Sequence, residues 1–401
     1  MKILWVNNLF LHPTTKGGQI RTLEMLKWLS QWHEVHYVAY DNPKTPEGMR
    51  RAGEYSARAY GCPFRITRRF TPAFFLELLQ NLASPLPSLI DRRRSPEMRE
   101  LLERLMREES FDAMVCDFLT PSINTPHLEN WILFQHNVET MIFRRYAATA
   151  HDPLRRWYFH NQAERLFRYE GEVCRGVRRV VAVSETDAET MRREFGVREV
   201  SVVPTGVNLE YFARRTEPAA AADLVLVGSM DWLPNIDGIT YFAHDILPRI
   251  RQRLPGCTVA VVGRDPVPAV RELANRDSGI QVTGTVADVR PYLWGSKVSI
   301  VPLRIGGGTR LKIYESMAAR TPVVSTSIGA EGLPVQSGEH IQLADTPEAF
   351  AERCVELLES APERERLSEA AWRLVAERFS WEGVARQFER FLKAAGSGAT
   401  A

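Results

Sequence analysis

A short stretch of the chain, residues 301–324, places glycines, cations and a carboxylate between two apolar runs. The residues of chemical interest in it are Gly306, Gly307, Gly308, Thr309, Arg310, Lys312 and Glu315. A strand before the glycines and a helix after them would leave free backbone N–H groups and the positive end of the helix dipole at the turn, which favours an anion. Because glycine has no side chain, a phosphate group could approach this backbone closely. The pattern indicates a phosphate-binding turn.

Lys312 and Glu315 stand three residues apart, so they share one face of the expected helix. A cation beside a diphosphate and a carboxylate that accepts hydrogen bonds from two ribose hydroxyls would suit a sugar nucleotide. A surface ion pair after a tight turn is the alternative that this spacing leaves open. No G-x-x-x-x-G-K-[ST] string occurs, and Leu311 stands where a dinucleotide fingerprint needs its third glycine, so ATP and NAD are disfavoured.

Runs rich in Val, Ile and Leu alternate with amphipathic stretches along the whole chain. The runs expected to be strands are residues 2–8, 34–40, 111–118, 131–137, 178–184, 223–230, 257–263, 280–286, 298–303, 321–327 and 340–344. Helical patterns lie between several of them, at residues 17–31, 95–109 and 187–196. Continuous apolar strands separated by helices predict an α/β fold whose parallel sheets are covered on both faces.

The segment 208–224 has a proline, a run of alanines and no clear strand period, so the domain boundary is expected near residue 215. Two doubly wound domains predict a cleft between the carboxyl ends of their strands, where ligands of open α/β sheets bind. The glycine stretch follows the expected strand 298–303, which places it at such an end.

Composition restricts the class of protein. The chain has 401 residues, 44% of them apolar and 25% charged, with a net charge of +2. These values suit a soluble two-domain protein, and nothing in the charge balance points to nucleic acid. Its five cysteines, Cys62, Cys116, Cys174, Cys257 and Cys354, form no C-x-x-C pair, which favours a reducing compartment. The N-terminal apolar run suits a first strand better than a signal peptide, and no run is long enough for a transmembrane helix, so a cytoplasmic protein is expected.

Residues 302–333, "PLRIGGGTRLKIYESMAARTPVVSTSIGAEGL", resemble the C-terminal signature of the family 4 glycosyltransferases, which have the two-domain GT-B fold. Further segments resemble that family in the expected order: residues 183–185, 202–208, 227–238, 261–266, 283–293 and 379–392. The resemblance covers nearly the whole chain and is strongest from residue 180 onward. It implies two Rossmann-like domains that face each other across a cleft, residues 1–214 on the acceptor side and 215–379 for the nucleotide sugar. It also implies a last helix, within residues 380–401, that crosses back to the N-terminal domain.

The resemblance implies a hexosyltransferase-type enzyme that moves a sugar, with retention, from a nucleotide-diphosphate sugar to an acceptor hydroxyl without a metal or other cofactor. The sequence contains no D-x-D triplet, the usual metal-binding motif of the other major glycosyltransferase fold. Protein cations and helix N-termini would then stabilise the charge on the leaving diphosphate. In this reading Glu315 binds the ribose, and Arg264 and Val286, in two of the resembling segments, belong to the donor site.

Two departures from the family pattern affect the donor site. Many members have a glutamate eight residues before the ribose-binding one, where this chain has Gly307. Many also have an arginine and a lysine after the first strand of the second domain, whereas residues 228–235, "GSMDWLPN", contain no cation. Arg310 and Lys312 are therefore the best candidates for the diphosphate clamp. Arg310 could instead be a solvated arginine at the start of the helix.

The N-terminal domain is expected to supply the acceptor side. Gly17 and Gly18 lead into a helix and, by the resemblance, approach the donor phosphate, although a plain turn would explain them equally well. His136 ends the expected strand 131–137, where family members often place a histidine that faces the donor sugar. Asp117 and Asn137 are assigned to the acceptor side, with a helix cap as the alternative for Asp117.

Residues 141–180 hold nine arginines and four acidic residues, and an apolar stretch before them ends at Arg92-Arg93-Arg94. These features predict a surface that could meet an anionic membrane and a lipid-linked acceptor. Ordinary solvated helix faces are the other explanation. The function expected is a glycosyltransferase of polysaccharide or glycolipid assembly, acting in the cytoplasm or at the inner face of the membrane. A nucleotide-sugar epimerase of the same fold and a catalytically silent binding subunit remain as alternatives.

Overall fold

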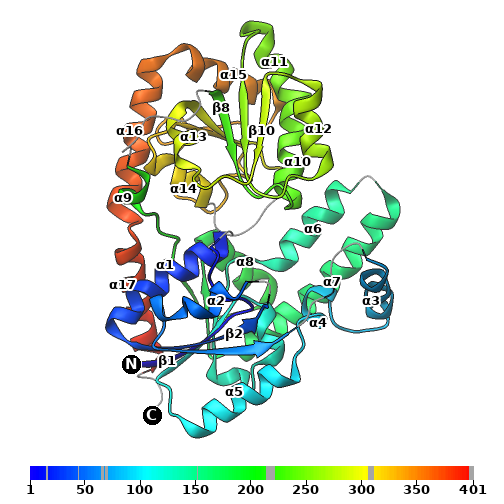
Figure 1. Cartoon of the computed structure of the whole chain (residues 1–401), viewed down its shortest axis with the longest axis vertical. Coiled ribbons are helices and arrows are strands. Elements are labelled where there is room, and N and C mark those ends of the chain that lie inside the picture. Colours follow the sequence, from blue (N-terminus) through cyan, green and yellow to red (C-terminus); the bar gives the residue numbers. More distant parts are fainter. Residues whose placement is uncertain are drawn as a thin grey trace. The chain divides into compact units, whose positions relative to one another are not determined.

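The computed structural model describes residues 1–14, 17–43, 45–64, 67, 71–150, 152–213, 222–305 and 311–396. The described chain forms two compact units (Figure 1), and the first consists of Met1–Thr205 together with the C-terminal segment from Trp381. The second unit starts at Gly206 and ends at Ser380. The predicted boundary between residues 214 and 215 lies outside the described residues.

Residues 206–213, which the prediction assigned to the first domain, group with the second unit. Arg290 Nη1 donates a hydrogen bond to the carbonyl oxygen of Tyr211 at 2.8 Å, and Trp294 Nε1 donates to that of Phe212 at 3.0 Å. These bonds attach helix α9 (Leu209–Phe212) to the second unit. A boundary defined by contacts therefore precedes the composition change on which the prediction was based.

The first unit contains a parallel sheet of seven strands in the order β3-β2-β1-β4-β5-β6-β7. The strands are β1 (Lys2–Val6), β2 (Glu34–Asp41), β3 (Arg58–Pro63), β4 (Ala113–Asp117), β5 (Ile132–Phe134), β6 (Arg179–Ala182) and β7 (Val200–Val202). The order reverses between β1 and β4, which makes their carboxyl ends the topological switch point of this sheet. The sequence did not predict β3, which contains a glycine and a proline, or β7, which has only three residues.

Helices cover both faces of this sheet because both faces are apolar. Ile3 and Trp5 of β1 belong to one buried cluster, and Leu4 and Val6 belong to another, as the two-residue period of a strand requires. The α-helices are α1 (Gly17–Trp32), α2 (Glu47–Arg50), α3 (Pro72–Leu82), α4 (Ser88–Asp91), α5 (Pro96–Glu108), α6 (Glu139–Thr149), α7 (Pro153–Gly176) and α8 (Glu185–Phe195). The 3₁₀ turns are η1 (Ala52–Glu54), η2 (Thr120–Asn124) and η3 (Leu128–Asn130).

The C-terminal helix α17 (Trp381–Gly396) is part of the first unit, which confirms the predicted return of the chain to the N-terminal domain. Trp381, Val384, Phe388 and Leu392 are buried in the same core cluster as the apolar face of α1. The Phe388 ring lies 5.6 Å from that of Trp5 and 4.9 Å from that of Phe134, between centroids. The apolar stripe of α17 therefore completes one face of the first sheet.

The second unit contains a parallel sheet of six strands in the order β10-β9-β8-β11-β12-β13. The strands are β8 (Ala222–Val227), β9 (Val259–Val262), β10 (Ile280–Gly284), β11 (Ser296–Val301), β12 (Val323–Ser325) and β13 (Gln342–Leu343). Besides α9, the helices are α10 (Leu233–Tyr241), the π-helical η4 (Phe242–Ile246), α11 (Leu247–Arg253), α12 (Pro268–Arg276), α13 (Arg290–Gly295), α14 (Leu311–Ala318), α15 (Pro347–Glu359) and α16 (Ala361–Arg378). The switch point lies between β8 and β11. Among the described residues, no helix is both long and apolar enough to cross a bilayer.

Candidate active site

Lys312 lies at the switch point of the second sheet, in the first turn of α14. Its Nζ donates a hydrogen bond of 2.7 Å to Oδ1 of Asn235, a buried residue near the start of α10. The Asn235 Nδ2 in turn donates to the carbonyl oxygen of Ser229 at 2.9 Å. A Cβ atom on Gly228 would lie only 3.1 Å from Lys312 Nζ, so the ammonium group lies directly against the loop that follows β8. Asn235 thus fixes the position of the cation.

Glu315 follows one turn later on α14 and is half-buried. Burial raises the pKa of its carboxyl group to about 7, and the nearby charge of Lys312 opposes that rise. Among the described residues, none donates a hydrogen bond to this carboxylate, and a carboxylate can accept hydrogen bonds from hydroxyl groups. The pair predicted from the sequence therefore combines a cation in a fixed position with a carboxylate that can bind hydroxyl groups.

The other predicted donor residues have different positions. Gly306, Gly307, Gly308, Thr309 and Arg310 lie outside the described residues. Arg264 follows β9, and its guanidinium forms ion pairs with Asp265 at 2.7 Å and with Asp231 of the β8 loop at 3.3 Å. Val286 is half-buried and packs against the core of the second unit. Arg264 thus lies beside the β8 loop with its charge compensated, and Val286 contributes apolar packing.

In the first unit, Asp117 ends β4 at the switch point and is fully buried. Its Oδ2 accepts hydrogen bonds from Trp5 Nε1 at 3.1 Å, Asn7 Nδ2 at 2.6 Å and Thr22 Oγ1 at 2.7 Å. Its Oδ1 is bonded to His136 Nε2 at 2.6 Å. Its two oxygens thus have four hydrogen-bond partners in all. The structure places Asp117 beneath His136, where it orients the imidazole ring.

His136 follows β5 and is almost completely buried. Burial lowers the pKa of its ring, and the charge of Asp117 partly offsets that effect. A neutral ring that donates from Nε2 to Asp117 has its lone pair on Nδ1, where it can accept a hydrogen bond from a hydroxyl. Phe118 stacks on the ring with centroids 3.8 Å apart, and this contact fixes the ring plane.

Gly18 lies against Phe118, the residue that stacks on His136. A Cβ atom at Gly18 would lie 2.5 Å from Cζ of Phe118, so a larger residue would displace the ring that stacks on His136. Gly17 is the first residue of α1. Asn137 follows His136, and its Nδ2 donates to Oε1 of Glu139 at 3.1 Å. The structure thus connects Gly18 and Asn137 to the surroundings of His136.

Sequence reasoning did not assign roles to the partners that hold these groups. Asn7 and Thr22 were not singled out, and Asn235 was considered only as part of a loop. One signal was available for Asn7, because a polar residue directly after the first strand of a doubly wound sheet lies at the switch point. The contacts of Thr22 and Asn235 depend on tertiary packing and leave no local pattern.

The described cysteine, histidine and acidic side chains form no further centre. Each of the five cysteines is a buried free thiol. Burial raises the pKa of Cys116, Cys174 and Cys354, which keeps them as unreactive thiols. Within the described ranges, no group of three or more His, Cys, Asp or Glu side chains is arranged to hold a metal ion.

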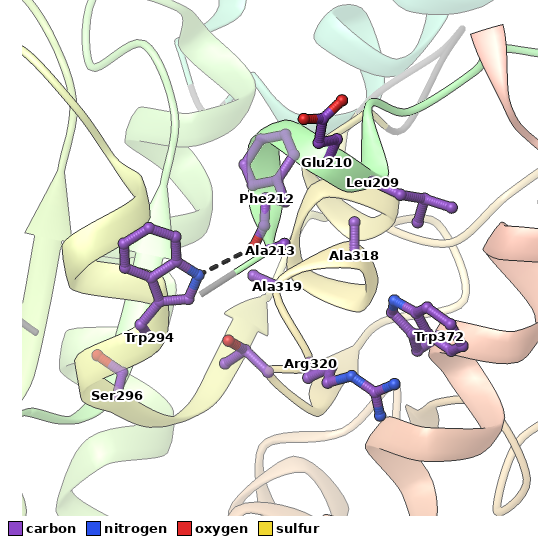
Figure 2. Close-up of a pocket in the computed structure, with 11 residues that line it drawn as sticks. Leu209, Glu210, Phe212, Ala213, Trp294, Ser296, Ala318, Ala319, Arg320 and Trp372 are labelled. Carbon is purple, nitrogen blue, oxygen red and sulfur yellow. Dashed lines mark hydrogen bonds between the residues drawn. The ribbon is translucent and has the colours of Figure 1, made fainter. Parts of the chain in front are cut away.

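A pocket of about 580 Å³ lies elsewhere in the second unit. Figure 2 shows Trp294 on one side of it and Arg320 and Trp372 on the other. Its lining includes Ser296, the first residue of β11, and Ala318, the last of α14. The pocket therefore lies toward the amino end of β11 and the end of α14 opposite Lys312, and no predicted site residue lines it.

The two doubly wound α/β units belong to the GT-B class of fold, as comparison with known structures shows. Sucrose-phosphate synthase from Thermosynechococcus elongatus is 16% identical, with full coverage of both chains and a TM-score of 0.76. Anabaena HepE, solved in complex with UDP and glucose, is 13% identical over 98% of this chain and 100% of the other, with a TM-score of 0.68. These likenesses establish the fold.

Sequence comparison identifies the family. Residues 15–211 match the profile described as "Glycosyltransferase Family 4", and residues 221–360 match "Glycosyl transferases group 1". Together the two matches span most of the chain, which belongs to family 4 of the glycosyltransferases. A phosphatidyl-myo-inositol mannosyltransferase of Mycobacterium tuberculosis is 28% identical over 233 residues. That match covers 55% of this chain and 60% of the relative.

Proposed function

We propose that this protein transfers a hexose, with retention of configuration, from a nucleotide-diphosphate sugar to an acceptor hydroxyl in the assembly of a polysaccharide or glycolipid. The family supports glycosyl transfer. HepE, which has the same fold, is described in complex with UDP and glucose, and the mycobacterial relative is described as acting on a phosphatidylinositol. A nucleotide-sugar donor and a sugar or lipid-linked acceptor are the substrate classes that follow.

The observation that carries the proposal is the placement of Lys312 at the start of α14, held by Asn235, with Glu315 one turn further on. A diphosphate beside Lys312 would lie near the positive end of the helix dipole. The ammonium group would then stabilise the negative charge that grows on the diphosphate as the glycosidic bond breaks. Glu315 would accept hydrogen bonds from the ribose hydroxyls, which fixes the nucleotide.

His136 is assigned to the sugar. Its Nδ1 would accept a hydrogen bond from a hydroxyl group of the donor sugar, while Nε2 remains bonded to Asp117. This contact would orient the sugar for reaction, and the neutral ring would not act as the nucleophile. Because protein groups alone stabilise the leaving diphosphate in this scheme, transfer is expected to need no divalent metal.

An apolar and basic surface of the first unit supports a membrane-bound acceptor. Leu79 of α3 is 65% exposed, and Leu154 and Trp157 at the start of α7 are 71% and 53% exposed. Arg155 and Arg156, also exposed, lie between those two. Apolar side chains beside cations suit the headgroup region of an anionic bilayer. We therefore place the enzyme at the inner face of the membrane.

Sedimentation with lipid vesicles tests this placement. The wild-type protein should bind vesicles that contain anionic phospholipid more strongly than neutral ones. The double variant Leu154→Ser/Trp157→Ser should lose much of that binding. Binding to neither kind of vesicle would refute membrane association, and equal binding to both would refute the role of anionic lipid. Either result leaves glycosyl transfer untouched.

The function itself is tested by incubating the purified protein with a panel of radiolabelled nucleotide sugars and candidate acceptors, with and without EDTA. Release of nucleotide with transfer or hydrolysis of the sugar, unchanged by EDTA, is expected. Isomerisation of the sugar without nucleotide release would identify an epimerase instead. Binding without any turnover would identify a silent subunit, and activity restored only by Mg²⁺ or Mn²⁺ would contradict the metal-independent scheme.

A further inference from the structure

A fully buried carboxylate, that of Glu170 on α7, lies beneath the segment that carries His136. Its Oε1 accepts hydrogen bonds from Gln135 Nε2 at 2.6 Å and from the Glu139 backbone N–H at 2.9 Å. Its Oε2 accepts from the backbone N–H of Thr140 at 2.8 Å and from Thr140 Oγ1 at 2.6 Å. All four donors belong to residues that flank His136 on either side.

These bonds complete the start of α6. The residue at the N-cap position, Val138, supplies no side-chain cap, so the first N–H groups of the helix need acceptors from elsewhere. Glu170 provides them from a different helix and places its carboxylate at the positive end of the α6 dipole. The segment between β5 and α6 is thereby tied to α7 before His136, through Gln135, and after it, through Glu139 and Thr140.

Burying this carboxylate is costly. No described Lys, Arg or His side chain forms an ion pair with Glu170, and its four hydrogen bonds compensate for lost contacts with water. Burial raises the pKa of Glu170 to about 7, while the bonds from Thr140, Glu139 and Gln135 lower it. The neighbouring carboxyl group of Glu139 also has its pKa raised to about 7, first by burial and then by the charge of Glu170. Because burial of the Glu170 carboxylate is unfavourable, its presence indicates that the segment between β5 and α6 must keep a defined conformation.

We propose that Glu170 is a positioning residue for His136, which holds the β5–α6 segment in the one conformation that brings Nε2 of His136 onto Asp117. His136 is then fixed by two carboxylates, directly by Asp117 and through the backbone by Glu170. The inference rests on the proposed function, in which His136 contacts the donor sugar. Glu170 itself touches no substrate.

The variant Glu170→Gln tests this role because it keeps the side-chain volume but turns an amide N–H₂ toward two of the four donors. The expected result is a fall in kcat of about tenfold or more with a much smaller change in KM for the donor, since small misplacements of a reacting group are costly. Ser95→Ala is the matched control: Ser95 is buried and caps α5 through a bond from the Met98 N–H at 3.2 Å. It should lower the unfolding temperature and leave kcat unchanged.

A double-mutant cycle with His136→Ala separates positioning from general damage. If Glu170 acts through His136, Glu170→Gln should slow the wild type but not the His136→Ala background. An equal slowing in both backgrounds, or no slowing in either, would overturn the proposal. Thr140→Val, which removes only one of the four bonds, gives the same test with a smaller effect should Glu170→Gln fail to fold.

A second readout does not depend on activity. In protein labelled at histidine, the NMR resonances of the His136 ring should shift in Glu170→Gln and stay unchanged in Ser95→Ala. An unmoved His136 resonance would contradict the positioning role even if no donor supports turnover. Conversely, a shifted resonance with no transfer from any nucleotide sugar would retain the positioning of His136 while refuting the proposed function.

Discussion

The switch points of the two sheets hold their functional groups in opposite ways. In the first unit, Asp117 is buried with both oxygens occupied, and the His136 ring it holds leaves only Nδ1 for a ligand. In the second unit, Glu315 is half-buried and has no described donor, and Asn235 fixes the Lys312 ammonium group. The first arrangement suits the orientation of a single hydroxyl group, whereas the second suits the binding of a large anionic ligand that brings its own donors and charge.

The largest effect is expected on removing the cation from the second switch point. Lys312→Ala should lower kcat/KM by about 10²-fold or more, the scale of losing one preorganised group that stabilises developing charge. The substitution should also weaken binding of the nucleoside diphosphate far more than binding of the bare nucleoside. Calorimetry can measure both affinities. Lys297→Ala is the control, since Lys297 pairs with Asp223 at 2.8 Å on the exposed surface of β11. Unchanged affinities for both ligands would show that Lys312 does not contact the diphosphate.

The second-largest effect is expected on replacing the buried carboxylate of the first switch point. Asp117→Asn places an N–H₂ group against either His136 or the three other donors, which favours the wrong tautomer of the ring or leaves buried donors unpaired. We expect kcat to fall about ten- to a hundredfold, with nucleotide affinity nearly unchanged. Asp112→Asn, at an exposed position just before the same strand, keeps an acceptor for the Lys2 N–H and should be neutral. A loss of nucleotide affinity in Asp117→Asn would contradict this prediction, because it would show that the first unit also determines nucleotide binding.

A smaller effect is expected from releasing the lysine without removing it. Asn235→Ala deletes the acceptor that holds Lys312 Nζ, so the ammonium group would sample several positions. Diphosphate affinity and kcat/KM should each fall by about tenfold, less than for Lys312→Ala. Asn275→Ala, which removes an exposed bond to Glu272 on α12, is the comparison. If Asn235→Ala matches wild type, the Lys312 position is set by other contacts.

The smallest effect is expected in the dependence of nucleoside affinity on pH. The free carboxyl group of Glu315 has its pKa raised to about 7, and ribose hydroxyls donate to its ionised form. Binding is therefore at full strength well above pH 7 and weakens as pH falls through that value, by about three- to tenfold at pH 6. The bare nucleoside must be used, because phosphate groups titrate in the same range. Glu315→Gln should bind more weakly at high pH and show a flat profile; a flat wild-type profile would argue against the ribose contact.

Local patterns in the sequence predicted much of this architecture. Apolar runs between helical stretches located the strands around both switch points. The glycine stretch singled out Lys312 and Glu315, and the position at the end of an expected strand singled out His136. The supporting contacts could not be predicted in this way, because they join residues far apart in the chain. Lys312 and Asn235 are separated by 77 residues, and Trp5 and Asp117 by 112. Glu170 gave no signal because an acidic residue within a helix usually faces water.

In the proposed function, the second unit binds the nucleotide and His136 of the first unit orients the donor sugar. Parallel measurements of nucleotide affinity and single-turnover transfer on Glu315→Gln and His136→Ala test it most directly. We predict that Glu315→Gln weakens nucleotide binding by about tenfold while retaining most of the transfer rate at saturation. His136→Ala should bind nucleotide within about twofold of wild type and transfer at least about tenfold more slowly, since it removes an interaction near the reacting sugar. The reverse pattern, with normal nucleotide affinity in Glu315→Gln and weakened affinity in His136→Ala, would contradict this division of labour.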